Sequence, residues 1–141
     1  MRRLLSQQDE SRVIAAIRAA ESRTSGEIRV HVERRCAGDP MMAARDWFRR
    51  LRMEATRERN GILFYVSVDD RRFAIVGDEG VHAKVGDTFW ATLRDDMQAA
   101  FAKGETCAGL TRAIDDAGTL LAQHFPRRPD DRNELADEIS S

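Results

Sequence analysis

Residues 62–66 constrain the fold more than any other part of the chain. All five side chains in this run, Ile-Leu-Phe-Tyr-Val, are largely apolar. A strand with one face in water alternates apolar and polar residues, whereas a continuous apolar run of this length is typical of a strand covered on both faces. We therefore expect this run to be the central strand of a sheet that has helices on both sides.

The sequence before this run predicts a helix, a strand and a second helix. Ser6 precedes two acids in the manner of a helix N-cap, and apolar residues then recur at helical spacing over residues 7–23. The segment around His31 alternates apolar and polar side chains, which predicts a strand with one wetter face and a half-exposed histidine. Asp39 followed by Pro40 is typical of the start of the second helix.

The order of these elements predicts the strand directions. A strand, a helix and a strand in succession form a crossover, so the strands over residues 27–34 and 62–68 are expected to be parallel. The turn at Asp69 and Asp70 is too short for another crossover. It therefore predicts a hairpin, in which the strand over residues 73–76 runs antiparallel to its predecessor.

Two apolar stripes at helical spacing follow, and Asp87 is placed to cap the first of these helices. Four helices and three main strands fit a three-layer α/β/α sandwich with a small mixed sheet, in which a parallel pair is joined by an antiparallel hairpin strand. We expect one domain over residues 1–126. Residues 127–141 are polar and predict a loosely held tail, in which Leu135 and Ile139 are the side chains able to dock.

Charge and composition argue against several classes of partner. The chain has 23 Lys and Arg against 24 Asp and Glu, a formal charge of -1, so no overall field attracts nucleic acid. The N-terminus lacks the apolar core of a signal peptide, and no run approaches the roughly 18 apolar residues of a membrane span. Cys36 and Cys107 have no metal-type spacing, which favours reduced thiols. These features predict a soluble, cytoplasmic protein of undetermined oligomeric state.

The predicted strand directions bring polar residues together at one edge of the sheet. Because the first two strands are parallel and the third is reversed, the starts of the first two and the end of the third share that edge. Carboxylates, an amide and backbone carbonyls exposed by glycines suit a hard divalent cation, calcium or magnesium. The predicted metal ligands are Glu27, Asn60, Asp78, Glu79 and Asp87.

The same residues have a plain structural explanation, in which Asp78 belongs to a turn, Asp87 only caps a helix and Glu27 faces water. The sequence therefore leaves three functions open. The first is a metal-binding or regulatory module without catalysis, with a possible protein partner. The second is a metal-dependent hydrolase that uses Glu27 or Asp78 to activate a water. The third is a purely structural or interaction domain; no catalytic nucleophile is identified for any of them.

The same residues also carry a resemblance to a known family. Over about residues 7–126 the chain resembles the TPM domain family, named after a thylakoid lumen protein, a photosystem II repair factor and a nematode receptor modulator. The order and spacing of several short motifs carry this likeness. They are Thr24-Ser25-Gly26-Glu27-Ile28, Asn60-Gly61-Ile62-Leu63, Phe73-Ala74-Ile75-Val76-Gly77 before an acidic loop, Phe101 with Gly104, and Gly109-Leu110-x-x-Ala113-Ile114.

The resemblance implies an α/β/α sandwich that binds calcium or magnesium-like ions in some members. It also implies an acid-phosphatase-like activity, which is proposed for the plastid branch of the family. The chain looks like a cytoplasmic bacterial-type member, because it lacks the export signal and the C-terminal membrane helix of many relatives.

Overall fold

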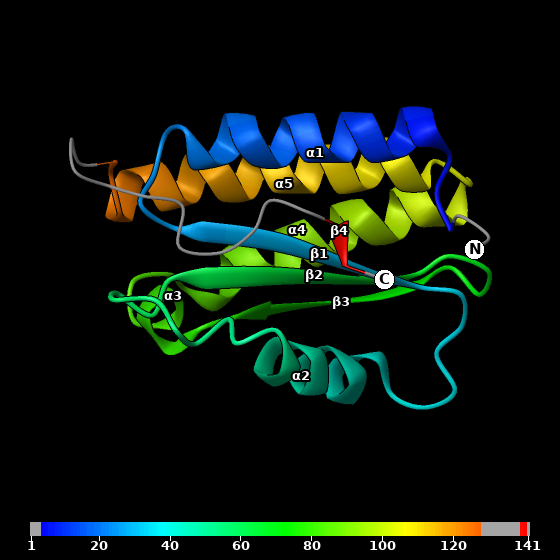
Figure 1. Ribbon diagram of the computed structural model, residues 1–141, viewed down its shortest axis with the longest axis horizontal. Coiled ribbons are helices and arrows are strands. Elements are labelled where there is room, and N and C mark those ends of the chain that lie inside the picture. Colours follow the sequence, from blue (N-terminus) through cyan, green and yellow to red (C-terminus); the bar gives the residue numbers. More distant parts are fainter. Residues whose placement is uncertain (1–3, 128–138, 141) are drawn as a thin grey trace.

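A computed structural model describes residues 4–127 and 139–140, and Figure 1 shows the arrangement of its helices and strands. The elements in chain order are α1 (Gln7–Glu21), β1 (Glu27–Glu33), α2 (Pro40–Arg50), β2 (Gly61–Ser67), β3 (Arg72–Gly77), α3 (Glu79–His82), α4 (Asp87–Ala102), α5 (Thr106–His124) and β4 (Ile139–Ser140). In the part of the chain that is described, none of the helices is long and apolar enough to cross a bilayer.

The sheet has the predicted strand directions. Its strand order is β3-β2-β1-β4, with β1 parallel to β2 and β3 antiparallel to β2. Helices α1, α4 and α5 cover one face, and α2 covers the other (Figure 1). The prediction of an α/β/α sandwich with a mixed sheet is confirmed. The short helix α3 and the short strand β4 add to the elements that the sequence pattern indicated.

Strand β2 is the centre of the core, as its apolar run predicted. All seven of its residues are buried. Ile62, Phe64 and Val66 pack into the large cluster shared with α1, α4 and α5, because alternate side chains of a strand point to the same face. Leu63 and Tyr65 point to the opposite face and pack against residues of α2. The two-sided burial explains why apolar residues fill every position of the run.

Helix α2 begins where the sequence predicted, and it ends before the apolar residues at helical spacing do. Asp39 accepts a hydrogen bond from the Met41 N–H as the N-cap, and Pro40 is the first helical residue. The stripe continues to Ala55, but the helix ends at Arg50 because Arg52 adopts a left-handed backbone with φ 56°. This turn brings the carbonyl oxygen of the buried Met53 to within 3.1 Å of where a Cβ on Gly61 would lie.

Strand β4 adds a fourth strand to the predicted sheet. Ile139 pairs with Val30, and Ser140 pairs with His31, in parallel with β1. Ile139 packs against the main core cluster, so the docking predicted for this side chain is observed. Leu135 and most of the predicted tail lie outside the described residues.

The strand register brings distant polar residues to one edge of the sheet. Glu27 pairs with Gly61, and the neighbouring Ile62 pairs with Gly77. The Asp78 N–H then donates to the Gly61 carbonyl at 2.9 Å. The first residues of β1 and β2 and the last residue of β3 therefore share one edge. We call this edge, with residues 25–27, 58–61 and 77–79, the rim.

Gly80 fixes the backbone of the rim by a close approach between two chain segments. Its N–H donates to the Arg59 carbonyl at 2.9 Å. A Cβ placed on Gly80 would lie 2.1 Å from the Glu58 carbonyl oxygen and 2.6 Å from the Arg59 carbonyl oxygen. Both neighbours are backbone atoms, so a side chain there requires the two segments to separate.

We expect Gly80→Ala to lower the free energy of unfolding by about 1–3 kcal/mol, the usual range for overpacking. Urea denaturation followed by circular dichroism measures the loss. The matched control is Gly38→Ala, where no atom lies within 4 Å of the added Cβ. The control is expected to change stability by less than about 0.5 kcal/mol. Equal effects of the two substitutions would contradict the close approach at Gly80.

Candidate functional site

Asp78 and Arg59 form the strongest polar contact at the rim. The Arg59 Nε donates to Asp78 Oδ2 at 2.7 Å, and its Nη2 donates to Asp78 Oδ1 at 2.9 Å. Asp78 Oδ1 also accepts from the Glu79 N–H at 2.8 Å, which makes Asp78 the N-cap of α3. The Asp78 side chain is 5% exposed. The carboxylate is therefore both a helix cap and the acceptor of a two-pronged guanidinium contact, the strong form of a charge-assisted hydrogen bond.

Arg59 also pairs with Glu79, with 3.3 Å between Nη1 and Oε1. The hydrogen bond with Asp78 raises the pKa of Arg59 above its ordinary value, against the opposing effect of desolvation, and the charges of Asp78 and Glu79 add to the rise. One guanidinium group thus pairs with two of the five predicted metal ligands. A cation at Asp78 and Glu79 would have to displace Arg59, so these two residues as they lie do not fit a metal ion.

Ser25, Glu58 and Asn60 form a second polar group at the rim. The Ser25 hydroxyl donates to Glu58 Oε2 at 2.7 Å. The Asn60 amide nitrogen lies 3.3 Å from Ser25 Oγ and 3.4 Å from Glu58 Oε2. Asn60 is 2% exposed, and the nearby Glu27 is 3% exposed. The rim therefore gathers a carboxylate and a hydroxyl, the oxygen ligands that hard divalent cations prefer, and the Asn60 amide N–H groups donate to both of them.

The prediction that Asp87 caps a helix is wrong. The N-cap of α4 is Gly86, and Asp87 is the first helical residue, where its exposed carboxylate lies in the positive first turn. Neither Asp87 nor Glu27 is linked to Asp78 by a hydrogen bond among those described. Among residues 4–127 and 139–140, no group of three or more His, Cys, Asp and Glu side chains is arranged to hold a metal ion. The strand register brings Glu27, Asn60, Asp78 and Glu79 to one edge without making them one set of ligands.

A second cluster of polar side chains lies on the α2 face of the sheet, and the sequence did not predict it. Glu33 accepts hydrogen bonds from the Trp47 indole nitrogen at 2.9 Å and from the Tyr65 hydroxyl at 2.5 Å. His31 places Nε2 3.2 Å from Glu33 Oε1 and Nδ1 3.0 Å from the Ser140 hydroxyl. The His31 ring stacks on the Trp47 ring with centroids 3.8 Å apart.

Burial controls the ionisation of this cluster. His31 is 0% exposed, so the prediction of a half-exposed histidine is wrong. Desolvation lowers the pKa of His31, against the opposing effect of the Glu33 carboxylate. Burial alone would raise the pKa of Glu33, but hydrogen bonds from Tyr65 and His31 outweigh it and hold that pKa below its ordinary value. Desolvation and the Glu33 carboxylate raise the pKa of Tyr65 far above its ordinary value. The cluster is therefore a carboxylate held by neutral donors.

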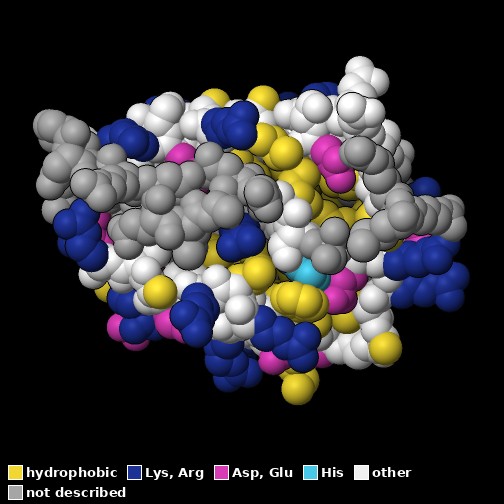
Figure 2. All heavy atoms as spheres, in the orientation of Figure 1, with side chains coloured by type: hydrophobic (Ala, Val, Ile, Leu, Met, Phe, Trp, Pro, Cys, Tyr) yellow, Lys and Arg dark blue, Asp and Glu magenta, His cyan; other side chains and the backbone are white. Residues whose placement is uncertain are grey.

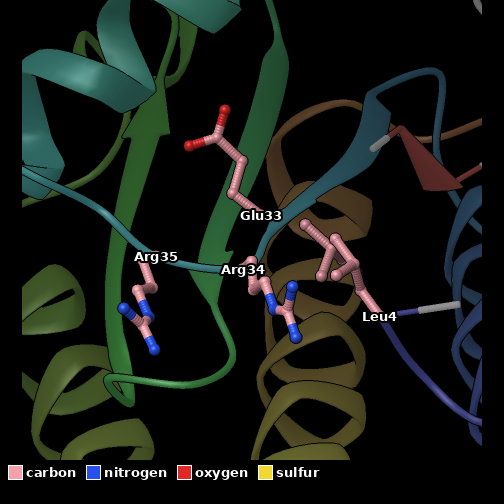
Figure 3. Close-up of a pocket in the computed structure, with 5 residues that line it drawn as sticks. Leu4, Glu33, Arg34 and Arg35 are labelled. Atoms are coloured by element: carbon pink, nitrogen blue, oxygen red, sulfur yellow. The ribbon is translucent and has the colours of Figure 1, made fainter. Parts of the chain in front are cut away.

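An open cleft of about 690 Å³ lies beside the C-terminal end of β1. It is lined by Leu4, Val32, Glu33, Arg34 and Arg35. In Figure 3 the Glu33 carboxylate extends away from Leu4 and Arg34, on the opposite side of β1. Arg34 donates to Asp69 at 3.2 Å, so the charge of this arginine is already paired at the hairpin turn. Arg35 lies 4.0 Å from the same carboxylate, so the charged residues of this cleft already have partners at the hairpin turn and at Glu33.

Alternation along β1 gave a partial signal for the Glu33 cluster. It placed His31 and Glu33 on one face, but it could not show that Trp47 and Tyr65 cover that face. The sequence did not predict the contact between Arg59 and Asp78, because the two residues meet only through the register of β2 and β3.

We expect Asp78→Ala to lower the free energy of unfolding by about 1–2 kcal/mol, since it removes both the cap of α3 and the acceptor of Arg59. Asp78→Asn keeps a capping side chain and should lose less. The control is Asp46→Ala, which removes an exposed ion pair with Arg50 and should change stability by less than about 0.5 kcal/mol. Urea denaturation measures all three, and a loss for Asp78→Ala no larger than the control would contradict the structural role of Asp78.

We expect part of the pH dependence of stability to come from His31. Its pKa is lowered in the folded protein, so the unfolded chain binds a proton first as the pH falls below about 6.5. The free energy of unfolding should therefore decrease between about pH 7.5 and about pH 5.5. His31→Gln should flatten this decrease, whereas the exposed His82→Gln control should keep it. Chemical denaturation at each pH provides the measurement, and an unchanged slope in His31→Gln would refute the assignment.

Comparison with known proteins identifies the family and supports the fold. The NMR structure of the BA42 protein from the psychrophilic bacterium Bizionia argentinensis aligns with a TM-score of 0.91 and 42% identity, over 99% of this chain and 97% of that one. The N-terminal domain of a P. gingivalis protein aligns with a TM-score of 0.67 and 20% identity, over 89% and 82% of the two chains. The N-terminal domain of the cg2496 protein from Corynebacterium glutamicum gives 0.61 and 14%, over 98% and 81%.

The last two alignments are below 25% identity and show a shared fold alone. A comparison with curated proteins found no match. The TPM domain matches residues 1–120, most of the chain, and the sequence motifs at the rim fall within this match. This chain belongs to the TPM domain family.

Proposed function

We propose that this chain is a binding domain without catalysis that takes a divalent cation, calcium or magnesium, at the rim. The observation that carries the proposal is the Glu58 carboxylate and the Ser25 hydroxyl, which the Asn60 amide nitrogen holds together beside the start of β1 at Glu27. Magnesium is usually bound through one or two carboxylates and keeps several of its waters, so it does not need a complete cage of protein ligands. A small set of one or two carboxylates with a hydroxyl suits such a hydrated ion.

The proposed site differs from the set of ligands predicted from the sequence. Glu27 remains a proposed ligand, and Glu58 and Ser25 join it. Asn60 remains a proposed ligand through its amide oxygen, which requires the amide to turn, because its nitrogen faces Ser25 and Glu58 in this structure. Asp78 and Glu79 form ion pairs with Arg59 instead, and the exposed Asp87 belongs to the first turn of α4. The segment that carries Glu58 and Asn60 also carries Arg57 and Arg59. An incoming cation competes with these guanidinium groups, so we expect weak binding.

A cation at the rim would connect two chain segments that are far apart in the sequence. Ser25 lies before β1 and Glu58 lies before β2. Bridging them would order the rim and reduce the repulsion among its carboxylates, since opposite charges attract strongly at short range. Such an ion would shape a surface for a partner protein. This binding role requires no catalytic nucleophile.

Titration with magnesium and with calcium, followed by the amide resonances of the labelled protein, tests the proposal. Saturable shifts are expected near residues 25–27 and 58–61. Glu58→Gln should abolish them, because it removes a proposed carboxylate ligand. The control Glu105→Gln removes an exposed carboxylate at the start of α5 and should leave the titration unchanged. Shifts that persist in Glu58→Gln would place the ion elsewhere.

A second variant separates the proposed site from the wider set predicted from the sequence. Asp87→Asn should leave the titration unchanged. Loss of the saturable shifts in this variant would show that Asp87 is a ligand after all. Hydrolysis of p-nitrophenyl phosphate with either ion present should not exceed that of buffer. Hydrolysis that disappears in Glu58→Gln would instead favour a phosphatase-like activity.

A further inference from the structure

A cleft distinct from the proposed cation ligands lies between α2 and the C-terminal end of β3. Its volume is about 410 Å³, within the range of sites that bind small molecules. Three arginines line it, Arg45 and Arg49 from α2 and Arg59 from the segment before β2. Figure 2 shows Lys and Arg side chains gathered low in the view, over α2. We call this feature the arginine cleft.

The arginines of α2 are available to a ligand. Arg45 and Arg49 are four residues apart on one helix, so they lie on the same face, with their Cβ atoms about 6 Å apart. Both side chains are exposed, and neither makes a hydrogen bond or ion pair with another described residue. Arg50, one position further along, pairs instead with Asp46 and lies over the Trp47 ring. Two unengaged guanidinium groups thus line the same cleft.

Arg59 is held in place by the rim. Its guanidinium is fixed by Asp78 and Glu79, and its backbone has a left-handed φ of 52°. A guanidinium has five N–H donors, of which these contacts use three. The remaining donors are pre-organised, because the carboxylates hold the group in one orientation. Asp78 also neutralises the charge of Arg59, so Arg45 and Arg49 supply the unbalanced positive charge.

The rest of the cleft is apolar, apart from one further acid. Phe48 and Val76 line it, and Gly77 contributes backbone without a side chain. The Glu54 carboxylate also lines the cleft and repels an anion there. Three arginines and the two acids Glu54 and Asp78 line the cleft, and Glu79 pairs with Arg59 from outside the lining. The attraction for an anion therefore comes from the adjacent, unengaged guanidinium groups of Arg45 and Arg49 and not from a net charge of the whole cleft.

We infer that the arginine cleft binds a small organic phosphate, with the phosphate group on Arg45 and Arg49 and an apolar body against Phe48 and Val76. Guanidinium groups match the oxygens of phosphate in a two-pronged contact, and two adjacent ones suit its double charge better than the single charge of a carboxylate. This inference goes beyond the proposed cation site and does not depend on it.

Phenylphosphonate tests the inference, because it has the charge of a phosphate, a flat apolar body and no ester bond to hydrolyse. Its binding is measured by amide shifts of the labelled protein in EDTA, so that failure of the cation proposal cannot affect the result. Saturable shifts are expected around residues 45–49, 59 and 76–78. Benzoate, with one negative charge on the same ring, should bind at least about tenfold more weakly.

Variants of single charges locate the binding. Arg45→Gln and Arg49→Gln should each weaken phenylphosphonate binding about tenfold, the effect of losing one hydrogen bond to a charged group. Glu54→Gln should strengthen it, because the repelling carboxylate is gone. The matched control is Arg50→Gln, which removes the same charge from the same helix outside the cleft and should leave the affinity nearly unchanged.

We expect each variant to fold, because Arg45 and Arg49 are exposed on α2 and make no described hydrogen bond or ion pair. Circular dichroism of each variant checks this. The absence of saturable shifts in the wild-type protein would overturn the inference. An Arg50→Gln effect as large as that of Arg49→Gln would also overturn it, because general attraction of anions would then explain the binding. Equal affinities for benzoate and phenylphosphonate would overturn the assignment to phosphate.

Discussion

The register of β2 against its two neighbours is the constraint on which the rest of the structure depends. Its residues are buried on both faces, so a shift of one position would exchange the residues that face α2 with those that face α1, α4 and α5. The same register pairs Gly61 with Glu27 on one side and places Asp78 beside Gly61 on the other. Core packing thus determines which polar residues meet at the rim.

At the rim, one internal cation, the Arg59 guanidinium, occupies a position where the sequence suggests a metal ion. Arg59 binds Asp78 and Glu79, and Asp78 also caps α3. A guanidinium tethered to the chain loses less entropy on pairing than a free ion does. A carboxylate that is almost fully buried needs such a partner to remain charged. The acids of this loop therefore stabilise the turn from β3 into α3. The oxygens near Ser25 are left as the more suitable position for an added ion.

The α2 layer joins two kinds of polar chemistry to the sheet. On its inner side, Trp47 donates a hydrogen bond to the Glu33 carboxylate, and its ring stacks on His31 and shields that side chain from water. On the side of the cleft, Arg45 and Arg49 remain unengaged beside Arg59. One short amphipathic helix thus supplies a neutral, buried contact to β1 and a charged wall to the cleft. This division follows from helical geometry, which places residues four apart on one face.

The sequence by itself determined the central strand, the directions of β1, β2 and β3, and the caps at Ser6 and Asp39, because these depend on local periodicity and short-range hydrogen bonds. It also predicted that the starts of β1 and β2 meet the end of β3. Tertiary structure alone decided that Arg59 engages Asp78, that Gly86 rather than Asp87 caps α4, and that His31 is buried beneath α2 and β4. Strand directions determine which segments become neighbours, whereas the pairing of side chains within such an edge depends on register and rotamers, which sequence periodicity does not encode.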